Sequence, residues 1–188
     1  QYGIYVGEYA CKTDVGIGNL TSAVSDAIFL MGCENNADVV KMTSYAPLLC
    51  HQKDRRWSVN LICFEDGKCF GIPTYHLLKL FARYRPDYMI GAETKTSSFT
   101  GEAHVFCNAG FQGDRLIVKI VNFSEESSEI RLDLSGYRPA EAYAMSHLDI
   151  RAENSVENPE NVCVRPVSPP EDTVTLPPYS FLLLVCEA

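Results

Sequence analysis

The chain has 188 residues, enough for one domain and part of another, and its 46% hydrophobic content sets it apart from disordered chains. A formal net charge of −8 argues against nucleic acid or an anionic membrane surface as the main partner. The apolar run at residues 181–186 is far shorter than the roughly 18 residues of a membrane-spanning helix, so no membrane partner is expected.

The first part of the chain predicts alternating strands and helices. Residues 4–8 and 39–45 are strand-like runs, and the first of them begins almost at Gln1, so we expect further chain upstream. Asn19 is a suitable N-cap for a helix whose apolar residues recur at helical spacing, and Gly32 is expected to end that helix. A second helix is predicted to begin at Pro73 and to end near Tyr84. This order is typical of a parallel sheet covered by helices.

From Asp87 onward the helical pattern disappears. Short strand-like runs alternate with turn residues, and the polar segment 152–161 is expected to form a long loop. This spacing predicts an antiparallel β-sandwich. The runs are residues 103–107, 115–122, 129–134, 173–176 and 181–186.

Eight cysteines suggest a disulfide or zinc framework until their positions are compared. The chain has no Cys-x-x-Cys pair, and the spacing of Cys50, Cys63 and Cys69 is irregular for a metal site. We therefore predict no metal and mostly buried free thiols, because cysteine often behaves as a small hydrophobic residue. Free thiols would fit a reducing compartment such as the cytoplasm.

Glu8 is the first candidate for chemistry. Side chains alternate along a strand, so Ile4, Val6 and Glu8 are expected to share one face. If this is a barrel strand, Glu8 lies at its carboxyl end, where barrel enzymes place catalytic groups. On the residues alone, a solvated surface glutamate at a strand end is the competing interpretation.

A set of short motifs then appears in order along nearly the whole chain. Together they resemble the C-terminal part of family 51 α-L-arabinofuranosidases of the plant and gut-bacterial type. The motifs include Val6-Gly-Glu-Tyr-Ala10, Asp38-Val-Val40, Met42-Thr-Ser-Tyr-Ala-Pro-Leu48, Asp54-Arg-Arg-Trp57, Glu157-Asn-Pro159 and Leu176-Pro-Pro-Tyr-Ser180.

The resemblance implies a (β/α)₈ barrel followed by a jelly-roll-like sandwich. Residues 1–85 would then be the last two β/α units of the barrel, and residues 86–188 the sandwich domain. It also implies a retaining mechanism that removes terminal arabinofuranosyl groups from plant poly- or oligosaccharides without a cofactor. Glu8 matches the nucleophile, while the acid/base glutamate belongs to an upstream strand. The chain alone is therefore expected to be inactive.

Trp57 and Asn60 match a loop that borders the sugar site in this family. An aromatic face beside a sugar ring, with an amide donor nearby, suits a polyhydroxylated substrate. The alternative is structural: Trp57 would close the barrel mouth and Asn60 would cap a turn. The family commonly has proline where this chain has Val59, so the path of the loop is open.

Two further expectations concern partners. The alternative to an enzyme is a non-catalytic β-sandwich that binds carbohydrate or packs against another domain, which would not need Glu8 or the helix after it. If the barrel is incomplete, Ile4, Val6, Val40 and Met42 lose their barrel interior. We then expect residues 1–85 either to pair with a second copy or to collapse onto the sandwich.

Overall fold

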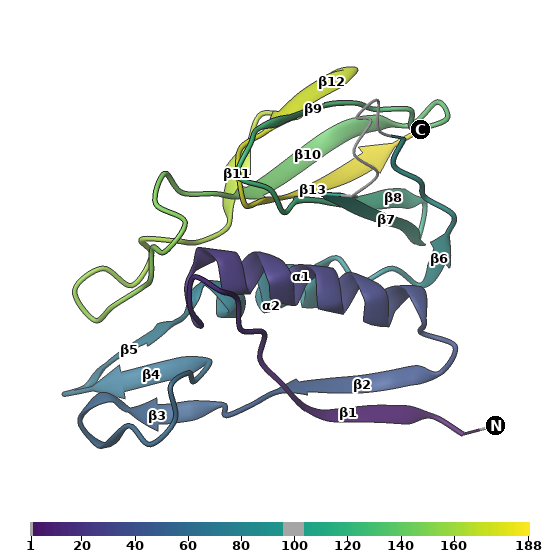
Figure 1. Ribbon diagram of the computed structural model, residues 1–188. Helices are drawn as coiled ribbons and strands as arrows, with labels where there is room; N and C mark the ends of the chain where they lie inside the picture. The colour runs from purple at the N-terminus through teal and green to yellow at the C-terminus, as the bar shows by residue number, and fades with distance from the viewer. Residues whose placement is uncertain (1, 96–103) are drawn as a thin grey trace. The chain divides into compact units, whose positions relative to one another are not determined.

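The computed structural model describes residues 2–95 and 104–188, and strands predominate among their regular elements (Figure 1). The chain divides into two compact units. The first unit contains Gln1–Leu80 and His147–Cys163, and the second contains Phe81–Ser146 and Val164–Ala188. Among the described residues, no helix has the length and apolar character needed to cross a membrane. The expected domains 1–85 and 86–188 stay a prediction, because compactness alone does not define a domain.

The first unit opens with a strand, a helix and a second strand. Strands β1 (Ile4–Tyr9) and β2 (Val40–Tyr45) pair in parallel, and α1 (Leu20–Asn35) connects them (Figure 1). Asn19 caps α1 as expected, because its side-chain oxygen accepts a hydrogen bond from the backbone N–H of Ser22 at 3.0 Å. A parallel pair requires such a crossover connection, since a short turn cannot return the chain to the same end of the sheet.

The expected end of α1 at Gly32 was wrong. The helix continues to Asn35, so Cys33 lies inside it. Asn36 ends it instead: its side-chain Nδ2 donates to the carbonyl of Gly32 at 2.8 Å, and its backbone N–H is shared between Gly32 and Cys33. An amide side chain that satisfies a free terminal carbonyl removes the need for glycine at the stop position.

A small sheet follows in the first unit. Strand β3 (Leu49–His51) pairs in parallel with β4 (Ile62–Glu65), which forms a hairpin with β5 (Lys68–Gly71). Asp66 and Gly67 form the turn of this hairpin, and both have positive φ, as a tight two-residue hairpin requires. Most of β4 lies in the apolar run at residues 60–64, whereas β3 and β5 were not predicted. A short 3₁₀ helix, Gln52–Asp54, follows β3.

A segment from late in the sequence returns to the first unit. The carbonyl of Ala152 accepts a hydrogen bond from the backbone N–H of Leu20 at 3.0 Å. Asn154 is buried, and its Nδ2 donates to the carbonyls of Gly71 (2.9 Å) and Val162 (3.0 Å) while its Oδ1 accepts from the Val162 N–H (2.7 Å). The predicted loop 152–161 is therefore a loop that completes the first unit.

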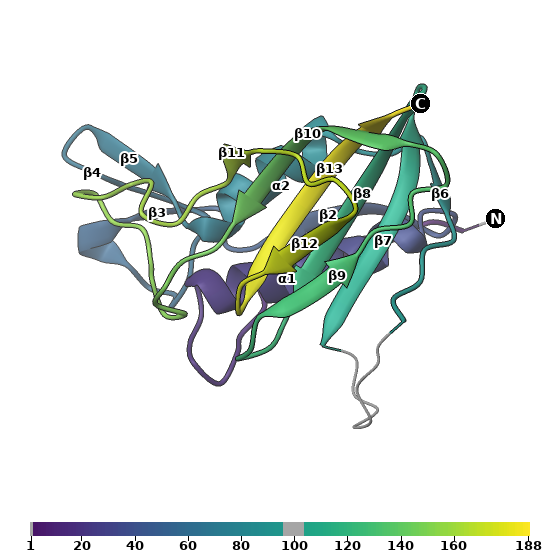
Figure 2. The same ribbon diagram turned by 90° about the horizontal axis from the view of Figure 1, so that it is seen from above.

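The second unit is an antiparallel sandwich, as the sequence predicted. One sheet has six strands in the order β11-β10-β13-β8-β7-β6, and β12 and β9 form the other. Figure 2 shows β9 and β12 along one face of the large sheet. The bounds are β6 Tyr88–Ile90, β7 Val105–Gln112, β8 Arg115–Asn122, β9 Ser128–Arg131, β10 Arg138–Met145, β11 Arg165–Val167, β12 Thr173–Leu176 and β13 Ser180–Glu187.

Alternation along the strands builds the core between these two sheets. Leu116, Val118 and Ile120 of β8 point to the same side. They belong to one hydrophobic core cluster, which also contains Leu184 of β13. Ile130 of β9 packs against the cluster from the other sheet. The expected run 103–107 overlaps β7, although its first residue, Ala103, lies outside the described residues. Three strands, β6, β10 and β11, were not predicted.

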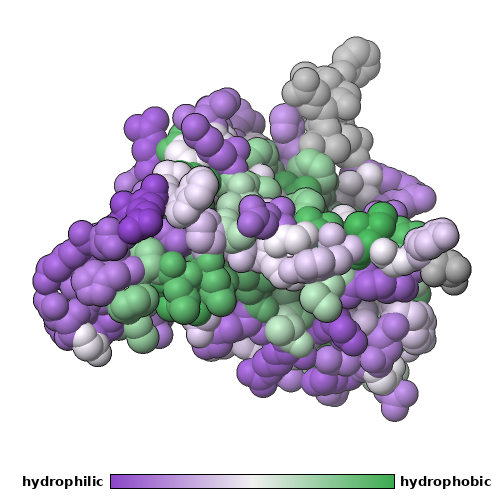
Figure 3. Space-filling view, turned by 90° about the horizontal axis from the view of Figure 1, so that it is seen from below, coloured by the Kyte–Doolittle hydropathy of each residue, from purple (hydrophilic) through white to green (hydrophobic). Residues whose placement is uncertain are grey.

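Several large apolar side chains of the first unit are exposed. Ile4 and Tyr5 of β1 and Met42 of β2 are each more than half exposed, as are Leu48 and Leu49. Figure 3 shows hydrophobic side chains gathered on the face that lies at the bottom of Figure 1. A face of this kind is usually covered by another part of a protein or by a partner.

Helix α2 (Pro73–Arg83) begins at the expected proline and ends one residue before the expected Tyr84. Its apolar side is buried, with Leu77 0% exposed.

Candidate active site

Glu8 is an exposed residue near the carboxyl end of β1. The pairing of β1 with β2 is irregular at this point, because Val6 pairs with Thr43 and Tyr9 pairs with Tyr45. Three residue steps on β1 therefore oppose two on β2, which is the geometry of a β-bulge. Bulges of this type redirect a side chain and are frequent beside active sites. The expected simple alternation of Val6 and Glu8 on one face does not continue through this bulge, whereas the position of Glu8 at the strand end agrees with the prediction.

A buried carboxylate lies close to this strand end. Asp26 of α1 is 0% exposed, and its Oδ1 accepts a hydrogen bond from the backbone N–H of Cys11 at 2.9 Å. Its Oδ2 accepts from the hydroxyl of Thr74 at 2.7 Å. Asp26 thus connects the chain just after β1 to both helices. Burial raises the pKa of Asp26 to about 6, and the hydrogen bonds from Thr74 and Cys11 offset only part of that effect.

Two tyrosines close the same end of the β1–β2 pair. Tyr9 and Tyr45 are strand partners, and their rings meet edge to face with centroids 5.3 Å apart. Among the described residues, neither phenol oxygen has a hydrogen-bond partner, although both are buried. Burial and the nearby charge of Asp26 raise the pKa of both phenols, so both stay neutral. The packed rings of Tyr9 and Tyr45 therefore support the strand end that carries Glu8.

Replacing Asp26 with asparagine should change how stability depends on pH. Because the folded pKa is raised, Asp26 stabilises the fold fully below its unfolded pKa near 4, and this contribution is lost as pH rises through about 6. The loss amounts to about 3 kcal/mol. Asp26→Asn can keep both hydrogen bonds but cannot ionise, so it should remove this pH dependence. Urea unfolding of the parent chain and of Asp26→Asn at pH 4.5 and pH 7 would measure this pH dependence. The same change in the free energy of unfolding between the two pH values in both proteins would contradict the assignment.

Trp57 and Asn60 lie in the segment between β3 and β4. Trp57 is 66% exposed, the state in which an aromatic face is available to a sugar. Asn60 is 2% exposed, and its Nδ2 donates to the carbonyl of Leu49 at 3.3 Å, while its Oδ1 has no hydrogen-bond partner in residues 2–95 and 104–188. Arg55 holds the loop, since its Nε donates to the carbonyl of Trp57 at 3.1 Å and its guanidinium also bonds to that of Ser58.

The three predicted site residues come from two sheets of the first unit. Glu8 is carried by the β1–β2 pair, and Trp57 and Asn60 by the connection within the β3-β4-β5 sheet. Asn60 uses one end of its amide to fix the backbone of β3, which is part of the structural role considered for it. Its Oδ1 is buried and finds no hydrogen-bond partner within the described part of the chain. Their roles toward a substrate stay predictions.

The cysteines only partly follow the expected burial. Cys50, Cys63, Cys163 and Cys186 are buried and Cys69 is exposed, and none of the eight forms a disulfide. Across residues 2–95 and 104–188, no group of three or more His, Cys, Asp or Glu side chains is placed to hold a metal ion.

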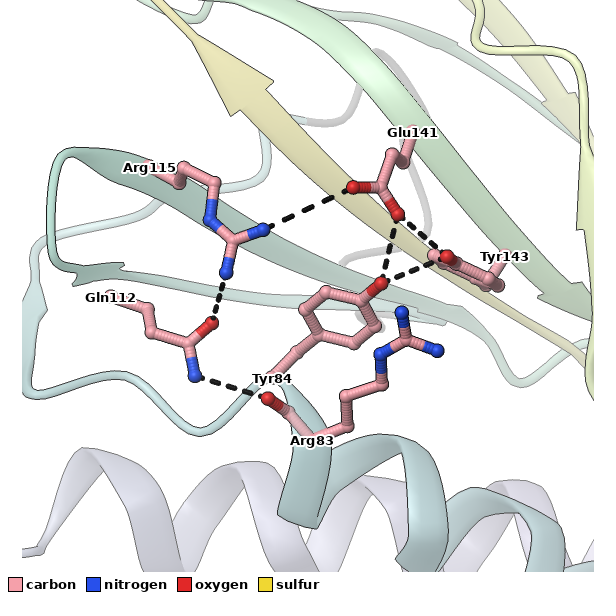
Figure 4. A network of polar contacts seen from close by, with 6 residues as sticks. All are labelled: Arg83, Tyr84, Gln112, Arg115, Glu141 and Tyr143. Carbon is pink, nitrogen blue, oxygen red and sulfur yellow. Dashed lines mark hydrogen bonds and ion pairs between the residues drawn. The ribbon is translucent and has the colours of Figure 1, made fainter.

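A polar network in the second unit was not predicted (Figure 4). The hydroxyls of Tyr84 and Tyr143 both donate to Oε2 of Glu141, at 2.9 and 2.6 Å, and lie 2.8 Å from each other. The guanidinium of Arg115 lies 3.9 Å from Oε1 of Glu141 and donates to Gln112 at 3.0 Å. Glu141 and Tyr143 are two residues apart on β10, so their side chains lie on the same face of that strand. The spacing could indicate this contact only if β10 had been predicted.

This network fixes the end of α2 to the sandwich sheet, because Gln112 donates to the carbonyl of Arg83 at 3.0 Å. The tyrosine hydroxyls hold the pKa of Glu141 below its usual range. Stability from this carboxylate is therefore present above the unfolded pKa and lost as pH falls through the lower folded pKa. These contacts join Arg83 at the end of α2 to β7, β8 and β10 and so support the structure of the second unit.

Tyr84→Phe should weaken this support. Removing one hydroxyl from this partly buried network costs about 1 kcal/mol, and the pKa of Glu141 should rise while staying below its usual range, because Tyr143 still donates to it. Carboxyl NMR titration and thermal melts between pH 3 and 7 would measure both effects. Tyr88→Phe is the matched control, because Tyr88 is exposed and stacks on Phe111 outside the network. An unchanged Glu141 titration in Tyr84→Phe would contradict the account.

Known proteins with the same pattern identify the family. The profile of the α-L-arabinofuranosidase C-terminal domain matches residues 7–180. α-L-arabinofuranosidases 1 and 2 of Arabidopsis thaliana are 30% and 32% identical over 189 residues, which cover 94% of this chain and 28% of each relative. An arabinose-bound family 51 α-L-arabinofuranosidase has a TM-score of 0.81 at 20% identity, over 96% of this chain and 31% of that one. The chain thus spans less than a third of these relatives, and it belongs to the α-L-arabinofuranosidase C-terminal domain family.

Proposed function

We propose that this chain is the C-terminal part of a retaining exo-α-L-arabinofuranosidase. In this proposal residues 1–85 form the last two β/α units of a (β/α)₈ barrel, and residues 86–188 form the sandwich domain that follows it. The substrate is a terminal α-L-arabinofuranoside of a plant polysaccharide or oligosaccharide. Family membership and the arabinofuranosidase names of the relatives support the substrate class.

The observation that carries the proposal is the position of Glu8. It is an exposed carboxylate at the bulged carboxyl end of a strand that pairs in parallel with the next one and is followed by a helix. Barrel enzymes place catalytic groups at this end of their strands. A non-catalytic sandwich module would not need this arrangement, so it favours the enzyme over the alternative.

Glu8 acts as the nucleophile in the proposed reaction. Its carboxylate attacks the anomeric carbon and forms a glycosyl-enzyme, while an acid/base glutamate from the upstream part protonates the leaving oxygen and then activates water. The two carboxyl groups of a retaining enzyme lie about 5–5.5 Å apart. The upstream part must therefore pack directly beside β1, and the exposed Ile4, Tyr5 and Met42 offer it an apolar surface.

Trp57 and Asn60 border the sugar in this proposal. The exposed indole supplies a flat apolar surface for one face of the furanose ring. The Oδ1 of Asn60 is buried, so a sugar hydroxyl can reach this acceptor only if the loop moves when substrate binds. The hydrogen bonds of Asn60 to the Leu49 carbonyl and of Arg55 to the Trp57 carbonyl hold the Asn60 amide and the loop backbone at Trp57 before substrate binds.

Covalent trapping in the intact parent protein tests the proposal. An arabinofuranoside with a good leaving group and a ring substituent that slows hydrolysis should accumulate as a glycosyl-enzyme, and peptide mapping should place the added sugar mass on Glu8. NMR of the first product formed should show retained anomeric configuration. A label on another carboxylate would reject Glu8, and an inverted product would reject the mechanism.

A further inference from the structure

Two buried cysteines face each other on neighbouring strands of the first unit. Cys50 of β3 and Cys63 of β4 are direct register partners in a parallel pair, and their Sγ atoms are 3.3 Å apart. They are 8% and 1% exposed and form one small core cluster with Phe70. Paired strands lie about 4.8 Å apart, which falls within the Cα separation that a disulfide tolerates.

The two thiols need only a small movement to bond. A disulfide has a sulfur–sulfur length of about 2.05 Å, so the two atoms must approach by roughly 1.2 Å. Rotation of the side chains can supply this without separating the strands, since each Sγ already points at the other. No other cysteine is in this cluster, and the neighbouring Cys69 is exposed on β5.

We propose that Cys50 and Cys63 are a latent disulfide site that closes the ends of the loop carrying Trp57 and Asn60. The bond would join the middle residue of β3 to the second residue of β4, and the loop lies between these two strands. The loop is already tied to this pair, because the Sγ of Cys63 lies 3.8 Å from the carbonyl of Asn60. The disulfide chemistry stands on its own, and its importance for a sugar site rests on the proposed function.

The oxidant is a low-molecular-weight disulfide such as oxidised glutathione. The thiolate of one cysteine attacks it, forms a mixed disulfide and releases one small thiol. The thiolate of the other cysteine then attacks the protein sulfur, forms the Cys50–Cys63 bond and releases the second small thiol. Two protein thiols are oxidised, one small disulfide is reduced, and the two protons leave on the two small thiols.

Burial decides when this exchange takes place. It raises the pKa of the Cys63 thiol to about 12, with a contribution from the adjacent Cys50, so the folded chain holds little of the reactive thiolate. The bond therefore forms while the chain folds and the thiols are still accessible. Once the unit is folded, the same burial protects whichever redox state has been reached.

Oxidative refolding of the chain tests the proposal. The reduced chain is unfolded in denaturant and diluted into glutathione with its disulfide, or into reductant alone. We expect the oxidised sample to lose two of its eight thiols and about 2 Da of mass, and peptide mapping should show residues 50 and 63 joined. Closing a loop of this length should raise the melting temperature by on the order of 5–10 °C.

Variants and alkylation separate this site from chance oxidation. Cys50→Ser should abolish the cross-linked peptide, whereas Cys69→Ser should retain it, since Cys69 is exposed and outside the pair. In the folded, reduced chain, iodoacetamide should modify Cys69 well before Cys50 or Cys63. A chain that refolds to its native circular dichroism without the 50–63 link, a link to another cysteine, or equal alkylation rates at Cys50 and Cys69 would each overturn the proposal.

Discussion

Glu8→Ala in the intact parent protein should lower the turnover of an aryl arabinofuranoside by on the order of 10⁴-fold or more, as removal of a catalytic nucleophile does elsewhere. Without the carboxylate no glycosyl-enzyme can form, so the two-step route is lost. Added azide should restore part of the rate, because a small anion can occupy the space of the missing side chain and attack the sugar. The product should then be the arabinosyl azide with inverted configuration.

The matched control is Asp38→Ala. Asp38 is an exposed carboxylate in the turn between α1 and β2, at the opposite end of the parallel pair from Glu8. It should keep the parent's rate and show no response to azide. Near-normal turnover by Glu8→Ala would refute the nucleophile assignment, and loss of folding in that variant would be visible in its melting temperature.

The 188-residue chain alone should show no measurable arabinofuranosidase activity. It supplies the proposed nucleophile without the acid/base group, and general acid–base catalysis typically contributes 10²–10⁴-fold. In the proposed barrel, the upstream strands supply the other surfaces that hold the sugar. A sensitive aryl arabinofuranoside assay on the purified chain would measure this directly.

Recombination with the upstream part provides the positive control. If the separately produced upstream part covers the exposed face of β1 and β2, mixing the two should restore turnover, and Glu8→Ala in this chain should abolish it again. Turnover by the purified chain alone that disappears in Glu8→Ala would show that it holds a complete site and would overturn the prediction.

The sequence predicted the elements that carry their own local signal. Helix α1 was found from its apolar spacing and its Asn19 cap, but its end was not, because the side chain of Asn36 replaces glycine as the stop signal. Strand β10 was missed since it contains Pro139 and alternates weakly, and its pairing with β13 supplies the stability that its own residues do not. The short strand β6 was likewise missed because it is stabilised by its pairing with β7 and not by a pattern in its own three residues.

The candidate site was predicted only where a motif was present. Glu8 stands in such a motif, whereas Asp26 reads as an ordinary polar position within a helix. Its one local signal is that Ala23 and Leu30, three and four residues away, are both apolar, which puts the carboxylate on a buried face. The Cys50–Cys63 contact could not be anticipated, because it depends on the register of β3, a strand that the sequence did not reveal.

The return of residues His147–Cys163 to the first unit constrains how the protein can be synthesised and divided. The carbonyl of Gly71 accepts a hydrogen bond from Asn154, which also bonds to Val162, and both residues are synthesised after most of the second unit. The first unit therefore cannot finish folding before most of the second unit has been synthesised. Expression of residues 1–85 by themselves would leave α1 without the carbonyl of Ala152 at its first turn. The first unit therefore needs residues from both sides of position 85 to complete its hydrogen bonds. Cutting the chain at that position would separate these residues.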